Sequence, residues 1–210
     1  MVAATAGCWR QVGATEAANG IVGTFQKKSL KMIGAREATL NALIQIFLDI
    51  CRLRRGPQDV PASWFLFGLT AAAYFVTGVI DMSAELGWPD TLVATLLDMA
   101  LMSGLLYMVL WIKLTTVRWQ QTMTAFYGAG ALLGLAMMPL VFWYEAAGPN
   151  TAGAVLPSLL LLAILMWQMF IIANILRHAL EVPLIMGGVF AALYLFINLR
   201  ILNALFFQAE

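Results

Sequence analysis

The chain has 210 residues, of which 62% are hydrophobic and only 11% are charged. Its mean hydropathy of +0.85 lies far above the range of soluble domains, which excludes a water-soluble globular protein and predicts a chain that folds in lipid. The formal net charge of +1 says little as a total, and nothing in the composition favours nucleic acid as a partner. We expect a single membrane domain in contact with the lipid bilayer.

The first 36 residues show no regular pattern. Gly, Ala and Thr are mixed with five cations, so we expect residues 1–36 to form a poorly ordered cytosolic tail. No apolar core follows these cations before Leu40, which argues against a cleavable signal peptide. Met32 offers an alternative start of the protein.

Residues 37–61 are expected to form an amphipathic helix and a turn. Up to Arg55, polar residues recur on one face of a helix and apolar residues on the other, and Gly56 and Pro57 then end the helix. The basic cluster of Arg52, Arg54 and Arg55 predicts an interfacial helix on an anionic membrane surface. The alternative is a helix that packs against the transmembrane bundle.

Five apolar stretches within residues 62–210 reach the length of about 20 residues that a helix needs to cross a bilayer. We therefore predict an all-α integral membrane protein, a bundle of five transmembrane helices preceded by the interfacial amphipathic helix. The predicted spans are 64–80, 91–112, 122–143, 155–176 and 183–206.

The distribution of the cations predicts the orientation. Eight of the twelve Lys and Arg residues precede the first span, and the second and fourth loops carry Lys113, Arg118 and Arg177. The first and third loops carry acids and no cation. The positive-inside rule then places the N-terminus in the cytoplasm and the C-terminus on the opposite side of a bacterial-type inner (plasma) membrane.

Arg200 is the only Lys or Arg inside a predicted span, and a cation in hydrocarbon normally has a partner or a function. Asp98 lies in the second span at a similar depth, because both residues are about 10 Å from the same interface at 1.5 Å per residue. This match predicts an intramembrane ion pair that either locks two helices together or takes part in moving protons or ions. In the remaining alternative, Arg200 extends to the lipid headgroups.

Amides and small residues supply further contacts between the helices. Arg200 and Asn203 are three residues apart and share a helix face, which we expect to point inward. Gly130 and Gly134 form a small-xxx-small pair of the kind found where membrane helices approach closely. The expected polar interior of the bundle comprises Gln168, Asn174, Asn198 and Asn203.

The sequence contains no pattern that indicates a cofactor or a reaction. Cys8 and Cys51 fall in the segment expected in the cytosol, where thiols stay reduced, and His178 is the only histidine. This leaves no zinc or haem ligand set, and no catalytic or nucleotide-binding motif occurs. We expect no cofactor and no enzymatic activity.

The turn Gly56-Pro57-Gln58-Asp59-Val60-Pro61, followed by five spans, resembles the Yip1-like membrane proteins, most of all their small bacterial members. The resemblance covers residues 38–206. Eukaryotic members act in membrane trafficking and bind small GTPases, but no GTPase-contact motif is present here, so that function does not carry over.

Three functions remain open, and one of them is a lipid-modifying or lipid-binding protein that uses the interfacial helix. We expect a non-enzymatic scaffold, assembly factor or accessory subunit of a membrane complex, with a membrane-protein partner or as a homo-oligomer. The alternative is a small transporter or channel component in which Asp98 and Arg200 line a polar intramembrane site.

Overall fold

The computed structural model describes residues 41–84, 86–148 and 151–206. The chain divides into two compact units, Met1–Gln45 and Ile46–Glu210. Of the first unit only residues 41–45 are described, and they are helical. The predicted tail 1–36 and the first residues of the predicted amphipathic helix lie outside the described residues.

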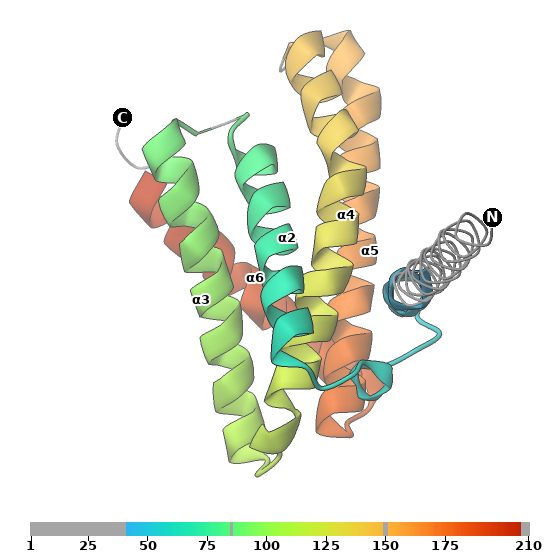
Figure 1. Cartoon of the computed structure of the whole chain (residues 1–210). Helices are drawn as coiled ribbons and strands as arrows, with labels where there is room; N and C mark the ends of the chain where they lie inside the picture. The colour runs from blue at the N-terminus through green and yellow to red at the C-terminus, as the bar shows by residue number, and fades with distance from the viewer. Residues whose placement is uncertain (1–40, 85, 149–150, 207–210) are drawn as a thin grey trace, which may run out of the picture. The chain divides into compact units, whose positions relative to one another are not determined.

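The second unit contains five long apolar helices that could cross a membrane, as predicted (Figure 1). This confirms the fold class of the described part and makes the chain a multi-pass membrane protein. Four of the helices extend past the predicted spans, because polar turns at their ends are also helical. The helices are α2 (Trp64–Met82), α3 (Trp88–Ile112), α4 (Trp119–Ala147), α5 (Val155–Leu180) and α6 (Leu184–Phe206).

Short elements connect the long helices. A helical segment, Asn41–Cys51, precedes them. The 3₁₀ helices η1 (Pro57–Asp59), η2 (Thr116–Arg118) and η3 (Ala152–Ala154) lie in the connections before α2, α4 and α5. The proline of η1 occupies its first position, where the missing N–H is not needed for a helical hydrogen bond.

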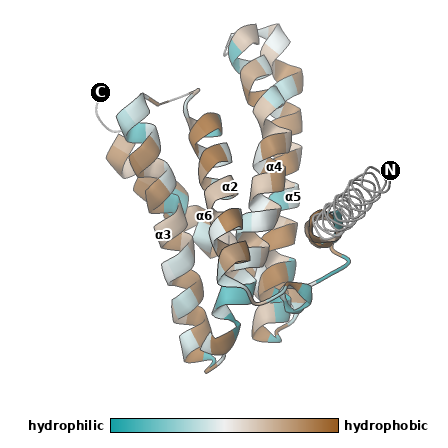
Figure 2. Cartoon of the chain, viewed as in Figure 1, coloured by the Kyte–Doolittle hydropathy of each residue, from teal (hydrophilic) through white to brown (hydrophobic). Residues whose placement is uncertain are grey.

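Hydrophobic residues run along all five helices (Figure 2), and many of their large apolar side chains are exposed. Phe65 on α2 and Ile185 on α6 are each 81% exposed, which would be costly in water but is normal against lipid chains. With lipid outside and apolar residues inside, helix association depends on close packing and on polar contacts.

Glycines allow the closest of these helix contacts. α2 packs along α4, where a Cβ atom on Gly130 would lie 2.5 Å from the Tyr74 ring and one on Gly134 would lie 3.0 Å from Thr77. Gly187 of α6 lies so close to the Ala173 carbonyl of α5 that a Cβ atom would collide with it. The predicted small-xxx-small pair is therefore at a helix contact.

We call residues 46–60 the pre-span segment. Its Phe47 and Ile50 are buried, and the Phe47 ring lies directly against Gly128 of α4. This part of the predicted amphipathic helix thus packs against the bundle, which was the alternative to an interfacial position. A place at the membrane surface stays a prediction for the basic cluster, in which Arg52 and Arg54 are exposed.

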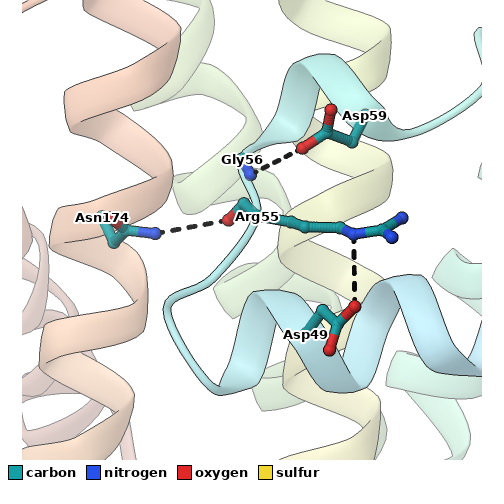
Figure 3. A network of polar contacts seen from close by, with 5 residues as sticks. All are labelled: Asp49, Arg55, Gly56, Asp59 and Asn174. Carbon is teal, nitrogen blue, oxygen red and sulfur yellow. Dashed lines mark hydrogen bonds and ion pairs between the residues drawn. The ribbon is translucent and has the colours of Figure 1, made fainter.

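Three donors from the bundle hold the pre-span segment. Trp167 donates to the carbonyl of Cys51 at 3.0 Å, Asn174 to that of Arg55 at 3.4 Å, and Gln121 to that of Val60 at 3.2 Å. Figure 3 shows the Asn174 contact together with the ion pair between Arg55 Nε and Asp49 Oδ2 at 3.2 Å. The third member of the basic cluster is therefore paired within the segment itself.

Candidate intramembrane cation site

The carboxylate of Asp98 on α3 is the point at which three helices meet. Asp98 is only 7% exposed. The Tyr74 hydroxyl of α2 donates to its Oδ2 at 2.7 Å, and the Tyr194 hydroxyl and the Asn198 amide of α6 both donate to its Oδ1 at 2.5 Å. We call these four residues the Asp98 cluster. All three hydrogen bonds have a carboxylate acceptor, the stronger class of protein hydrogen bond.

Local sequence explains how these donors reach Asp98. Tyr194 and Asn198 are four residues apart, so they share one face of α6. The Tyr74 ring fits over Gly130 and packs at 5.2 Å from the Tyr127 ring, centroid to centroid. Glycine on one helix and aromatic residues around the ring therefore fix the direction of the Tyr74 hydroxyl.

Arg200 is not the partner of Asp98, contrary to the prediction. Its side chain is exposed, and its guanidinium lies over the Phe196 ring at 5.5 Å from the centroid. No ion pair joins it to an acid in the described part of the chain. Successive residues of an α-helix are rotated by about 100°, so Arg200 points about 200° away from Asn198, which faces Asp98.

Asn203 shares the outward face of Arg200, so the expectation that this face points inward was wrong. Its amide donates to the Leu199 carbonyl of its own helix at 2.9 Å. The other expected interior amides are placed differently. Asn198 and Asn174 are buried, and Gln168 is half-buried at the wall of a cavity.

This cavity has a volume of about 280 Å³ and lies beside Asp98, between α2, α3 and α4, with Gln168 of α5 also in its wall. Glycines and apolar residues form part of its wall, including Gly134 and Met137. None of its lining residues is Lys, Arg or His. The polar residues of the wall are Tyr74, Thr77, Asp81, Thr95, Asp98 and Gln168.

Asp81, near the end of α2, is the second carboxylate of the cavity. Its Oδ1 is buried and accepts no hydrogen bond from any described residue. A buried carboxylate oxygen without a donor or a cation is costly, and such groups normally have a partner. Asp81 therefore differs from Asp98, whose two oxygens both accept hydrogen bonds.

Two hydroxyl groups of the wall are oriented as acceptors. Thr77 Oγ1 donates its proton to the Ala73 carbonyl at 3.1 Å, and Thr95 Oγ1 donates to the Thr91 carbonyl at 2.8 Å. A hydroxyl that has used its only proton still has lone pairs to offer. Together with the carboxylates, they give the cavity a set of oxygen atoms that can act as ligands.

Sequence reasoning missed three residues of this site. Tyr74 and Tyr194 count as apolar in hydropathy patterns, although the spacing between Tyr194 and Asn198 is a signal for a shared polar face. Asp81 was assigned to a loop because the predicted span ended one residue before it, whereas α2 continues to Met82.

No family model, curated protein or solved structure matches this chain. The Yip1-like resemblance therefore stays a prediction that rests on the pre-span turn and the order of the spans.

Proposed function

We propose that this protein is a small transporter or channel component that binds a monovalent cation in the cavity between α2, α3 and α4. The observation that carries the proposal is the wall of that cavity, which has two carboxylates, Asp81 and Asp98, and no basic side chain. Ionisable residues inside membrane spans are costly, and those that line cavities mark ion or substrate pathways.

The two carboxylates have different roles in this proposal. Asp98 is held by three donors, so it supplies a fixed negative charge at the wall. Asp81 has a buried oxygen free of hydrogen bonds among the described residues, so it is the direct ligand. The Thr77 and Thr95 hydroxyls complete the shell, since oxygen donors suit hard cations.

The charge of the ligand follows from the number of acids. Among the described residues, no group of three or more His, Cys, Asp or Glu side chains is placed to hold a metal ion. Two carboxylates, one of them already hydrogen-bonded, favour a singly charged cation over Ca²⁺, which usually takes about six to eight oxygen ligands.

The expected location and orientation belong to the same proposal. Arg118 in the α3–α4 connection pairs with Glu181 after α5 at 2.7 Å, so these two connections lie at one end of the bundle. Lys113 lies in the first of these connections, and Arg177 lies in the last turn of α5. A shared basic end supports a cytoplasmic face of a bacterial-type inner membrane, with α6 ending on the other side.

The test uses the full chain in lipid nanodiscs and measures the thermal unfolding midpoint in Na⁺, K⁺ or Li⁺ chloride, with N-methylglucamine chloride at equal ionic strength as reference. A ligand that binds only the folded state raises the midpoint as its concentration increases. We expect one of the three cations to do so, and Asp81→Asn to remove the increase.

Asp90→Asn is the matched control, because Asp90 is exposed in the first turn of α3 and does not line the cavity. It should keep the full cation response. An equal response in wild type and Asp81→Asn, or no response to any of the three cations, would overturn the proposal. Asp98→Asn is less informative, since it also disturbs the contacts among α2, α3 and α6.

A further inference from the structure

The outward face of α6 carries a regular stripe of exposed residues. They follow one another at intervals of four, three, four and three residues, the spacing that forms a seam between two paired helices. We call this the α6 outer stripe. Its members are Val189 (57% exposed), Leu193 (46%), Phe196 (60%), Arg200 and Asn203.

Arg200 makes this stripe unlike an ordinary lipid-facing surface. It lies two residues beyond Asn198, which contacts Asp98, and six residues before the end of α6 at Phe206. At 1.5 Å per residue its Cα is about 3 Å from the level of Asn198 and about 9 Å from the helix end. The Arg200 side chain is therefore attached to the helix well inside the span.

The contacts of Arg200 within the chain do not neutralise its charge. It lies over the Phe196 ring, and the described residues offer it no carboxylate. A ring face contributes only part of what a buried cation needs. Charged side chains in spans pair with an opposite charge or with backbone carbonyls. We therefore expect the stripe to bind a partner that carries an acidic side chain.

Among the described residues, Asp81, Asp90 and Asp98 of a second copy of this chain do not supply that acid. Two-fold pairing of α6 with itself would place the two Arg200 side chains near each other, since such an interface uses the same patch twice. Asp98 is buried, and Asp81 lines the cavity. Asp90 is exposed, but it lies eight residues from Asp98, or about 12 Å nearer the helix end.

We propose that the α6 outer stripe binds a transmembrane helix of a different protein, which carries an Asp or Glu at the depth of Arg200. The apolar part of the stripe packs against this helix, and Arg200 pairs with the acid. This interface is on the opposite face of α6 from Asn198, so it stands independently of the cation cavity.

The test measures binding of a synthetic single-span helix to the full chain in phosphatidylcholine vesicles by energy transfer between fluorescent labels. The probe helix has an apolar seam of the same spacing and an Asp about 9 Å from one end. Matched probes carry Asn or Leu there, or the Asp on the opposite face. Each probe is made in both sequence directions, so that parallel and antiparallel pairs are both sampled.

We expect the Asp probe to bind about three- to twentyfold more tightly than the Asn probe, the range of single polar contacts between membrane helices. Arg200→Gln should remove this advantage, whereas Arg54→Gln, at an exposed arginine outside the spans, should keep it. Arg200→Asp combined with an Arg probe should restore it. The thermal midpoint of each variant checks that it is folded.

Equal binding of the Asp and Asn probes to wild type would overturn the proposal and indicate that Arg200 extends to the headgroups. An advantage that survives Arg200→Gln would also overturn it. So would Arg200-dependent energy transfer between two labelled copies of the full chain, because the occupant would then be a second copy.

Discussion

Three side-chain donors contact the Asp98 carboxylate and three others contact the pre-span segment, but the acceptors differ. In the Asp98 cluster one side-chain carboxylate receives all three donors. In the pre-span segment three separate backbone carbonyls each receive one donor, from Trp167, Asn174 and Gln121. The first arrangement concentrates its contacts in one residue, and the second distributes them.

This difference determines how each region responds to mutation. Loss of the Asp98 carboxylate removes three contacts at once and leaves the Tyr74 and Tyr194 hydroxyls without their acceptor, which costs more than the lost bonds alone. No single substitution removes more than one of the three bonds to the pre-span segment, because a backbone carbonyl is present whatever the side chain. The predictions below test this contrast.

Asp98→Leu is expected to have the largest effect. Each polar contact between membrane helices is worth about 0.6–1.7 kcal/mol, so loss of three should lower the free energy of unfolding by about 2–5 kcal/mol. Denaturant titration in detergent micelles measures this change. Asp90→Leu, at an exposed position of the same helix, should change it by only a few tenths of a kcal/mol, and equal effects of the two variants would contradict the central role of Asp98.

Gly130→Ala and Gly128→Ala compare the two regions with the same chemical change. An added Cβ meets the Tyr74 ring at position 130 and the Phe47 ring at position 128. We expect Gly130→Ala to cost about 1–3 kcal/mol, the usual cost of overpacking, because Tyr74 is fixed by Asp98. Gly128→Ala should cost less, because Phe47 belongs to a segment that can move away.

Gly104→Ala serves as the control for this comparison, since a Cβ there has no neighbour within 4 Å. It should be neutral or slightly stabilising, because alanine favours helix more than glycine. The same unfolding titration applies to all three variants, and a larger loss in Gly128→Ala than in Gly130→Ala would reverse the proposed order of the two regions.

Asn174→Leu should have a smaller and more local effect. It removes one hydrogen bond, to the Arg55 carbonyl, worth about 0.6 kcal/mol. We expect faster hydrogen exchange in residues 46–60 and an almost unchanged global midpoint. Unchanged exchange in the segment would show that this bond does not hold it.

Changes at Cys51 should have the smallest effect on stability, and the rate at which its thiol is modified is a sensitive measure of how the pre-span segment docks. Burial raises the pKa of its thiol from 9.0 to about 11, so at pH 8 the reactive thiolate is about a hundredfold scarcer than in an exposed cysteine. In a Cys8→Ser background, maleimide should therefore modify Cys51 about a hundredfold more slowly than a cysteine introduced as Arg54→Cys in a chain that also carries Cys51→Ser.

The pH dependence of this segment follows from the same shift. The folded state binds the thiol proton more tightly, so this contribution to docking is complete below pH 9 and is lost as the pH rises from 9 to about 11. Asn174→Leu should accelerate the modification of Cys51 at pH 8. Fast modification in the undisturbed chain would contradict the buried position of the thiol.

The five helices could be predicted from the sequence because a membrane span is a long run of apolar residues, and such a run is directly visible in a sequence. The depth of a residue along its helix is equally easy to predict, because it follows from counting residues. Asp98 was therefore expected to contact α6, and it does. The direction around the helix is harder to predict. Arg200 and Asn198 differ by two residues in sequence and by about 200° in direction. The residue that contacts Asp98 is therefore Asn198 and not the charged Arg200.

Other contacts depend on backbone groups and helix ends, which the types of the residues do not indicate. The acceptors for Trp167, Asn174 and Gln121 are backbone carbonyls, which every residue has, so no sequence pattern indicates them. The cavity depends on where α2 ends and on how its side chains pack against Gly130 and Gly134. The predicted first span ended at residue 80 and α2 ends at Met82, and this difference of two residues placed Asp81 in a loop.

The contacts of α6 also set an order for assembly during synthesis. Ala173 and Gly187 are near in sequence, so α5 and α6 can pair as soon as both are made. The donors Tyr194 and Asn198 follow Asp98 by 96 and 100 residues, so until α6 emerges the carboxylate has only Tyr74 from this cluster. The arrival of α6 is therefore the step that completes the Asp98 cluster.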